Sequence, residues 1–565
     1  MTSYNDAEFN SPDQWAPSDQ STEARDNPTP PPSMRPGADN GPALDGEYRP
    51  ELEMHRRLDA CEYLDRRGDK KLSPPTQRLA EMFAAWFWPL SFRGTVWLST
   101  RQGWEPPEGG ILRPLGDSET VSRAQARFAR KYPREPIPSK AAVETALGAF
   151  AGTADELDTK PWLRWGRAND GALWWDSGRA DGRSVRVTAD GWSIEPRPGC
   201  WFVRTELTVP MPLPAQDGGD LEALWEHVRI PKQDRGVVVG WMLAASQPER
   251  SRAAGILYLS GPSGAGKSCA ADIIARAGGA PADRKQFGAN KMDGRDFLVG
   301  ASAGWVTYLD NLSMLTAEQS DTLCCLVTGL TETYRTMRTN VDTTSIDISR
   351  PVIATSVEIP VLRADLITRM APVQLDLPYH PRPEDDVMAD AEAAQPRIFG
   401  GYLNLLSKVM ASEHLPVPAE VPLPRLAVMG RMAHAADRYR GAEGTLKRLE
   451  HTQGELLNET LTDDPFFATI IREVKTEFVG GGELLLAHID PDQSLAAKYG
   501  KQWPIGSKGV SHRLKRHVGA FARAGWTVKS VAATHHQPTQ WIITPPSRQA
   551  RSTDKSAIEE KSSPF

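Results

Sequence analysis

The chain has 565 residues, of which 40% are hydrophobic and 24% are charged, and its net charge is −6. These proportions are ordinary for folded protein and exclude a largely disordered chain, while the length predicts roughly three or four folded units. No apolar run approaches the roughly 18 residues of a transmembrane helix, and the five cysteines form neither a disulfide framework nor a zinc-type pair. The acidic N-terminus lacks the apolar stretch of a secretory signal, so we expect a cytoplasmic protein without membrane contact.

The first 235 residues divide into two parts of different composition. Residues 1–50 are rich in Pro, Asp, Ser and Asn, so we expect them to be disordered. Residues 51–235 hold eleven of the 17 tryptophans, and their turn signals and short apolar runs predict a Trp-rich α+β domain with hairpins. Core packing is the favoured interpretation of these tryptophans, and a stacking platform for single-stranded bases is the alternative. The range contains no primase-type aspartate pair followed by a usable histidine.

Apolar runs alternate with helical segments over residues 236–380, which predicts an α/β core. The expected strands are residues 255–261, 304–311, 349–357 and 371–377. A helical, charge-mixed segment is expected over residues 381–460.

The sequence GPSGAGKS at residues 261–268 matches the phosphate-binding pattern G-x-x-x-x-G-K-[ST], with an apolar strand before it and a helix after it. In such a loop, backbone N–H groups surround a phosphate, the lysine ammonium reaches the β- and γ-phosphates, and the serine hydroxyl binds Mg²⁺. A plain glycine-rich turn is the alternative, which the strand–helix context disfavours. We therefore expect ATP and Mg²⁺ here, with nucleotide contacts from Gly261, Pro262, Ser263, Gly264, Ala265, Gly266, Lys267, Ser268 and Cys269.

A buried strand ends further along the chain at Asp310 and Asn311. An aspartate at such a strand tip holds Mg²⁺ through water, which is the Walker-B role, and capping of the next helix is the alternative. Asn311 stands where many such ATPases carry a second acid that activates water, and an asparagine orients water but cannot take its proton. Hydrolysis is then expected to be slow, or to use another carboxylate such as Asp321 or Glu332.

The strand over residues 350–356 ends in two hydroxyl residues, where a sensor of the γ-phosphate is expected, and we assign Ser356 to the nucleotide site. Arg363 and Arg369 follow it. Either arginine could enter the site of a neighbouring subunit and stabilise charge on the transferred phosphoryl group. A surface salt bridge is the alternative for each.

Residues 333–342 predict a short hairpin that carries Arg335 and Arg338. In a ring ATPase such a loop would project into the pore and hold DNA phosphates. A solvated turn would have the same sequence pattern, so both interpretations stay open.

The C-terminal region is strongly basic although the whole chain is acidic. Residues 493–553 contain no Asp or Glu, and ten lysines and arginines give this window a charge of +10. Helices followed by a hairpin over residues 461–545 predict a winged helix, with residues 507–523 as the recognition helix above a buried apolar stripe. A basic protein-docking face is the alternative, and the tail 546–565 is expected to be disordered. The expected DNA contacts are Lys508, Ser511, His512, Arg513, Lys515, Arg516 and Arg523, with Ser511, His512 and Arg513 placed to reach base edges.

The segments GPSGAGKS, VTYLDN, LCCLVTGLTETYRTMRTN, RPVIATS and ADLITRM together resemble the ATPase core of superfamily 3 helicases of phages and mobile elements. These form the poxvirus-type primase–helicase group within the AAA+ proteins. The chain is particularly similar to ATP-binding proteins of actinobacterial phages and integrative elements. The resemblance covers about residues 160–380 and extends through the basic region to about residue 545.

The resemblance implies a homo-hexameric ring that moves along single-stranded DNA in a bacterial host cell, with ATP held between subunits. By position, it implies that Lys267 and Ser268 bind phosphate and Mg²⁺ and that Asp310 holds the metal. It also implies an arginine finger in trans at Arg369, and a DNA loop that carries Arg335 and Arg338. Asn311 departs from the usual second acid, and Ser356 departs from the usual sensor asparagine.

The sequence therefore predicts an α/β P-loop ATPase of the AAA+ type that acts as a DNA helicase or translocase in replication. A primase or polymerase would come from a separate gene, and the winged helix would bind duplex or forked DNA. The alternative is an ATP-controlled initiator, loader or regulator that does not unwind DNA. An NTP-dependent defence protein is a weaker third hypothesis, because no effector motif is found.

Overall fold

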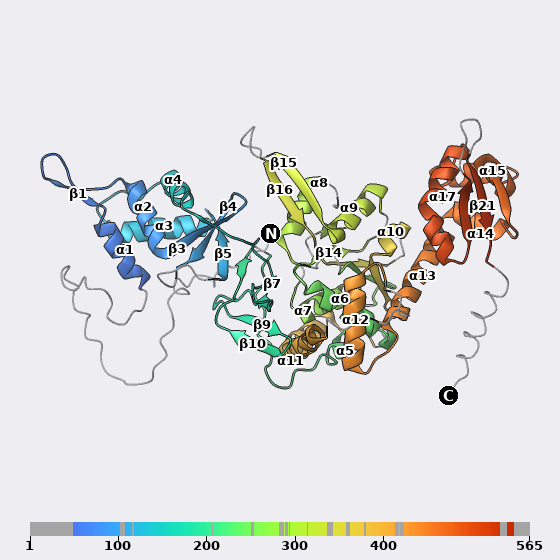
Figure 1. Cartoon of the computed structure of the whole chain (residues 1–565), viewed down its shortest axis with the longest axis horizontal. Helices are drawn as coiled ribbons and strands as arrows, with labels where there is room; N and C mark the ends of the chain where they lie inside the picture. Colours follow the sequence, from blue (N-terminus) through green and yellow to red (C-terminus); the bar gives the residue numbers. More distant parts are fainter. Residues whose placement is uncertain are drawn as a thin grey trace, which may run out of the picture. The chain divides into compact units, whose positions relative to one another are not determined.

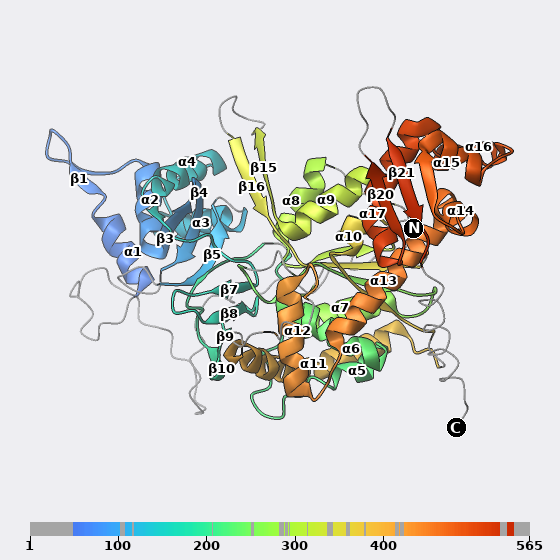
Figure 2. The same ribbon diagram turned by 45° about the vertical axis from the view of Figure 1, so that its right-hand side comes forward.

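The computed structural model describes residues 49–101, 108–115, 118–205, 207–249, 254–281, 287–288, 292, 294–312, 315–335, 343–357, 362–377, 380–412, 417, 423–531 and 539–546. The segments expected to be disordered, residues 1–50 and 546–565, lie almost entirely outside these ranges, which begin at residue 49 and end at residue 546. Within them, helices and sheets build a mixed α/β fold (Figures 1 and 2). No helix in this part of the chain is both long and apolar enough to cross a membrane.

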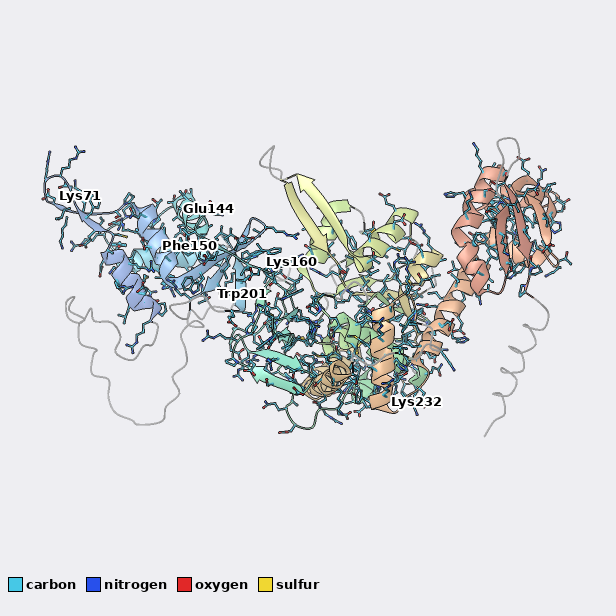
Figure 3. All side chains as sticks on the ribbon, viewed as in Figure 1. Lys71, Glu144, Phe150, Lys160, Trp201 and Lys232 are labelled. Carbon is cyan, nitrogen blue, oxygen red and sulfur yellow. The ribbon has the colours of Figure 1, made fainter. Side chains whose placement is uncertain are left out.

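The first folded segment combines helices with a five-stranded sheet. Its helices are α1 (Pro50–Asp59), α2 (Pro75–Trp86), α3 (Ser118–Lys131) and α4 (Lys140–Ala151). The sheet has the order β11 (Trp201–Val203), β5 (Gly110–Pro114), β4 (Thr95–Thr100), β3 (Phe87–Phe92), β6 (Asp155–Glu156), and a separate hairpin pairs β1 (Glu62–Leu64) with β2 (Lys70–Leu72). The helices bury one common core, which includes Phe83 and Phe128 and also Phe150, labelled in Figure 3.

A second, antiparallel sheet has the order β10 (Gly191–Glu195), β9 (Ser184–Thr188), β8 (Leu173–Asp176), β7 (Trp165–Arg167). The turn before β8 contains Gly171 at φ 84°, a backbone conformation that glycine adopts without strain. Trp165 and Trp175 are fully buried, and their indole N–H groups donate to the carbonyls of Gly278 (3.2 Å) and Gly279 (2.6 Å). Those carbonyls directly follow helix α7 (Lys267–Ala277), so this sheet is fastened to the end of α7.

Burial confirms the packing interpretation for the tryptophans of residues 51–235 that the structure describes. Six of them are at most 9% exposed, namely Trp86, Trp165, Trp174, Trp175, Trp201 and Trp225. Trp88, Trp97, Trp162 and Trp192 are half-buried against the same cores. Trp104 lies outside the described residues.

The central sheet is wholly parallel, with the order β13 (Phe287–Gly288), β14 (Thr307–Asp310), β17 (Val352–Ser356), β12 (Ile256–Ser260), β18 (Met370–Gln374). All four strands that the sequence predicted for this region are confirmed. Helices α6 (Arg235–Ala245) and α7 belong to the core on one face, and α8 (Gly294–Ala303), α9 (Ala317–Thr328) and α10 (Ala364–Ile367) to the core on the other. Because parallel strands present their carboxyl ends at one edge, the residues that end β12, β14 and β17 come together there.

The remaining chain is largely helical. It includes α5 (Leu224–His227) ahead of the central sheet, and α11 (Glu384–Ala411), α12 (Ala427–Arg440) and α13 (Thr445–Asp463) after it. Helices α14 (Pro465–Glu473), α15 (Gly482–Ile489), α16 (Ser494–Tyr499) and α17 (Gly506–Arg523) then accompany a sheet of order β19 (Phe478–Gly481), β21 (Gln540–Thr544), β20 (Thr527–Val531). The predicted hairpin of β20 and β21 is confirmed, and β19 is a third strand that the sequence did not indicate.

Candidate functional site

The loop between β12 and α7 has the backbone that a phosphate-binding turn requires. Gly261, Gly264 and Gly266 adopt φ values of 145°, 83° and 78°, where residues with a Cβ are strained. A Cβ on Gly261 would also lie 2.4 Å from the carbonyl oxygen of Leu375, so no side chain fits at that position. The loop ends in the first turn of α7, whose free backbone N–H groups favour an anion.

Lys267 lies folded over this loop. Its Nζ donates to the carbonyls of Gly261 and Pro262, both at 2.8 Å, and the residue is only 8% exposed. Burial lowers the pKa of Lys267, and the charge of Asp310 acts in the opposite direction. The ammonium therefore occupies the mouth of the loop, where a phosphate oxygen could replace its carbonyl partners.

Asp310 ends β14 beside the loop and collects three hydroxyl groups. Its Oδ1 accepts hydrogen bonds from Thr355 Oγ1 at 2.7 Å, from Tyr308 Oη at 2.9 Å and from Ser268 Oγ at 3.2 Å. No hydrogen bond from a described residue reaches Oδ2. The structure thus brings together Lys267, Ser268 and Asp310, as the sequence predicted, and leaves one carboxylate oxygen open.

Asn311 has a left-handed backbone, with φ 54°, and its side chain is exposed. Asparagine tolerates this conformation better than most residues with a side chain. Its backbone N–H donates to Thr355 Oγ1 at 2.9 Å. Of the alternative bases, Asp321 accepts a 2.5 Å hydrogen bond from Arg363, and the side chain of Glu332 lies outside the described set.

The two hydroxyl residues that end β17 point to opposite faces of the sheet. Thr355 reaches Asp310, whereas the fully buried Ser356 donates to the carbonyl of Leu312 at 2.6 Å. Ser356, the residue that the sequence assigned to the nucleotide, thus faces away from Asp310. Sequence reasoning passed over Thr355 and Tyr308; strand alternation would have placed Tyr308, two residues before Asp310, on the same face as that carboxylate.

Both arginines of the predicted finger already have acidic partners. Arg363 contacts Asp321 at 2.5 Å and Asp365 at 3.5 Å, with 27% of its side chain exposed. Arg369 donates to the backbone carbonyl of Asp365 at 2.6 Å and lies 3.7 Å from its carboxylate, and only 11% of its side chain is exposed. Of the two, Arg363 is therefore the more accessible.

A hairpin follows α9, as the sequence predicted, and pairs β15 (Leu330–Arg335) with β16 (Thr343–Ile348) in antiparallel register. Arg335 is the last residue of β15, and its side chain is outside the described set. Arg338, at the expected tip, lies outside the described residues.

Helix α17 buries the predicted stripe, since Val510, Leu514 and Phe521 are fully buried and Val518 packs against them. Lys508, His512 and Lys515 are exposed and follow one another at helical spacing, so they form one ridge. The side chains of Arg516 and Arg523 are not described.

Two of the seven expected DNA contacts on α17 have side-chain partners within the C-terminal segment. Arg513 Nη1 lies 3.2 Å from Asp464 Oδ1, and Asp464 caps α14 by accepting from Phe466 N at 2.9 Å. Ser511 Oγ accepts a 3.2 Å hydrogen bond from Trp541 Nε1. Arg513 and Ser511 thus connect α17 to α14 and β21, inside the C-terminal segment.

Residues 228–455 match the model of a family described as Actinomycete integrative conjugative element replication protein. No curated protein matches the chain. Among solved structures, it is similar to the A-form apo C-terminal region of NrS-1, with 11% identity, a TM-score of 0.34 and coverage of 83% of this chain and 98% of that one. It is also similar to an inhibitor-bound JCV helicase, with 15% identity, a TM-score of 0.20 and coverage of 41% of this chain and 62% of that one.

Proposed function

We propose that the protein is an ATP-dependent DNA motor, a helicase or translocase that acts in the replication of a phage or integrated element. The observation that carries the proposal is the convergence of Lys267, Ser268, Asp310 and Thr355 at the carboxyl edge of a parallel sheet. The family match over residues 228–455, which includes all five strands of this sheet, supports a role in replication. The glycine conformations and the strand order support a P-loop core of the AAA+ type.

The residues at this edge fit Mg²⁺ and ATP phosphates. A serine hydroxyl carries one proton and two lone pairs, so Ser268 can donate to Asp310 Oδ1 and still offer its oxygen to the metal. Asp310 Oδ2 would accept hydrogen bonds from water around Mg²⁺, and loop N–H groups with Lys267 would hold the β- and γ-phosphates. The metal would neutralise charge that develops on the transferred phosphoryl group.

Water attack is the step for which the chain is least equipped. Asn311 can orient a water molecule but cannot remove its proton, and its backbone is fixed by Thr355. We assign the γ-phosphate sensor role to Thr355 in place of Ser356, because Thr355 already contacts Asp310. Turnover would then be slow, or another carboxylate such as Asp321 or Glu332 would take the proton.

A ring, taken as a homo-hexamer, would supply the positive charge that one subunit lacks. Arg363 or Arg369 of one copy would approach the phosphates of its neighbour, after leaving the acidic partners Asp321 and Asp365. Arg363 is favoured as the arginine finger because its side chain is more exposed, although the family resemblance points to Arg369. ATP binding would then be coupled to the contact between subunits.

DNA would be bound at two places. The β15–β16 hairpin, with Arg335 and Arg338, would hold single-stranded DNA in the ring. The C-terminal helices and three-stranded sheet fit a winged helix, whose ridge of Lys508, His512 and Lys515 would contact duplex or forked DNA, with Arg516 and Arg523 adding charge. A primase or polymerase encoded elsewhere would complete replication.

Asn311 favours one alternative, an ATP-controlled initiator or loader that binds DNA but does not unwind it. ATP hydrolysis with and without single-stranded DNA, using Lys267→Ala as the blank, separates the two. Turnover that DNA stimulates, together with strand separation on a forked substrate, supports the motor. Tight ATP binding with turnover near background and no response to DNA supports the switch and rejects the motor.

A further inference from the structure

Tyr308 places a polar group in the buried strand β14. The residue is 1% exposed, and its neighbour Leu309 is fully buried. A buried hydroxyl is unfavourable unless it is hydrogen-bonded, and here the phenol donates to Asp310 Oδ1 at 2.9 Å. Burial raises the pKa of Tyr308 to about 12.

A second buried tyrosine shows that this contact is not a general property of the sheet. Tyr258 on β12 is fully buried, and burial also raises the pKa of its phenol to about 12. It faces the opposite core, on the same side as Ser356, and has no contact with Asp310. Sheet packing therefore accommodates buried tyrosines at both positions, and only Tyr308 has its hydroxyl on the carboxylate.

The three donors reach Oδ1 from different elements. Tyr308 comes from β14, Thr355 from β17 and Ser268 from α7. Tyr308 and Thr355 are both almost completely buried and belong to packed strands, so their hydroxyls cannot drift. Because three hydroxyl groups donate to Oδ1, the Asp310 carboxylate cannot rotate freely, and the orientation of Oδ2 is fixed.

We infer that Tyr308 is a positioning residue that fixes the Asp310 carboxylate, so that Oδ2 is presented to the water shell of Mg²⁺ bound with the nucleotide. The inference rests on the proposed nucleotide site and adds to it a residue that the phosphate-loop motif does not include. Tyr308 itself touches neither nucleotide nor metal. Its role is therefore specific to the metal-dependent part of nucleotide binding.

The test compares Tyr308→Phe with the matched control Tyr258→Phe in the full-length chain. Binding of a fluorescent ATP analogue is titrated in EDTA and at increasing Mg²⁺. For Tyr308→Phe we expect the Mg²⁺ concentration that gives half of the maximal increase in nucleotide affinity to rise roughly 10- to 150-fold, which corresponds to the loss of one hydrogen bond to a charged group. Binding in EDTA should equal that of the unaltered protein, and Tyr258→Phe should match it in both titrations.

Other results would overturn the inference. An unchanged Mg²⁺ dependence of nucleotide binding in Tyr308→Phe would show that the hydroxyl is dispensable. An equal loss of nucleotide affinity in EDTA and in Mg²⁺ would show that Tyr308 has a purely structural role. Thr355→Val removes another donor to Oδ1. Titrated with a fluorescent ADP analogue, which has no γ-phosphate for Thr355 to contact, it should show the same loss of metal-dependent binding, so the inference remains testable even if Tyr308→Phe fails to fold. If the unaltered protein does not bind Mg²⁺–nucleotide, the proposed function itself is wrong. If it binds with a clear Mg²⁺ dependence and Tyr308→Phe has the same dependence, only this inference is wrong.

Discussion

The phosphate loop with Asp310 and the ridge on α17 are built in opposite ways. In the first, side chains on β14, β17 and α7 are hydrogen-bonded to Asp310, and Lys267 is hydrogen-bonded to the backbone of the loop. In the second, Lys508, His512 and Lys515 are exposed on one helix and depend on no common partner. A buried hydrogen bond to a charged group is worth about 1.5–3 kcal/mol, whereas an exposed charge acts through screened, additive attraction.

This contrast says how each region could carry function. The buried cluster works only as a unit, so one substitution should remove most of its effect. The ridge sums several weak contacts, so single substitutions should have small effects that depend on salt. Each of the following predictions would sharpen or break that distinction.

The largest effect is expected at Lys267. Lys267→Ala should weaken ATP binding by about 2–3 kcal/mol, or roughly 30- to 150-fold, because it removes a charged donor to the phosphates. Calorimetric titration with Mg²⁺–ATP measures the change. The matched control is Lys232→Ala, an exposed lysine outside the loop and labelled in Figure 3, which should bind ATP as the unaltered protein does.

The next effect concerns the ridge. The double variant Lys508→Ala/Lys515→Ala should lower the slope of log affinity against log salt by about 2, because each lysine releases about one counterion from duplex DNA. Fluorescence anisotropy with duplex DNA at several salt concentrations measures the slope. An unchanged slope would remove α17 from the DNA interface, and Lys232→Ala/Lys408→Ala is the control with exposed lysines elsewhere.

Arg513 tests the boundary between the two kinds of site. Its contact with Asp464 predicts that Arg513→Ala lowers the free energy of unfolding by about 1 kcal/mol, since the pair is partly exposed. DNA affinity should change less than for Lys515→Ala. Thermal unfolding and anisotropy measured together decide the point, and a large loss of DNA affinity at unchanged stability would return Arg513 to the DNA-binding set.

The smallest effect is a pH dependence at Asp464. Burial raises the pKa of this carboxyl despite the nearby charge of Arg513, so the folded state holds the proton more tightly than the unfolded state does. The resulting stabilisation is complete below the unfolded pKa and is lost as pH rises through the folded pKa. The stability of the unaltered protein relative to Asp464→Asn should therefore fall on going from acidic to neutral pH, as denaturant unfolding across that range would show.

The sequence predicted the strands of the central sheet and the strand–loop–helix arrangement of β12 and α7 because both are encoded locally. Strands are read from apolar runs, and the loop from fixed spacing. The choice between Thr355 and Ser356 could not be made in this way. It depends on the register of β17 against β14 and β12, which sets the hydroxyl that faces Asp310.

The basic helix was predicted correctly as a helix with a buried stripe, whereas the partners of two of its polar side chains could not be predicted. Arg513 and Ser511 are polar residues whose partners, Asp464 and Trp541, are distant in sequence. Composition cannot reveal such pairs. The role of Tyr308 escaped for the same reason, since an aromatic residue in a buried strand is usually explained by packing alone.

Two tryptophans connect the C-terminal end of α7 to the β7–β10 sheet. If phosphates bind at the first turn of α7, as proposed, a tilt of this helix would be largest at its other end, where Trp165 and Trp175 attach the β7–β10 sheet through Gly278 and Gly279. A small displacement of α7 at the nucleotide site would thus also move the β7–β10 sheet, although that sheet supplies no residue of the site.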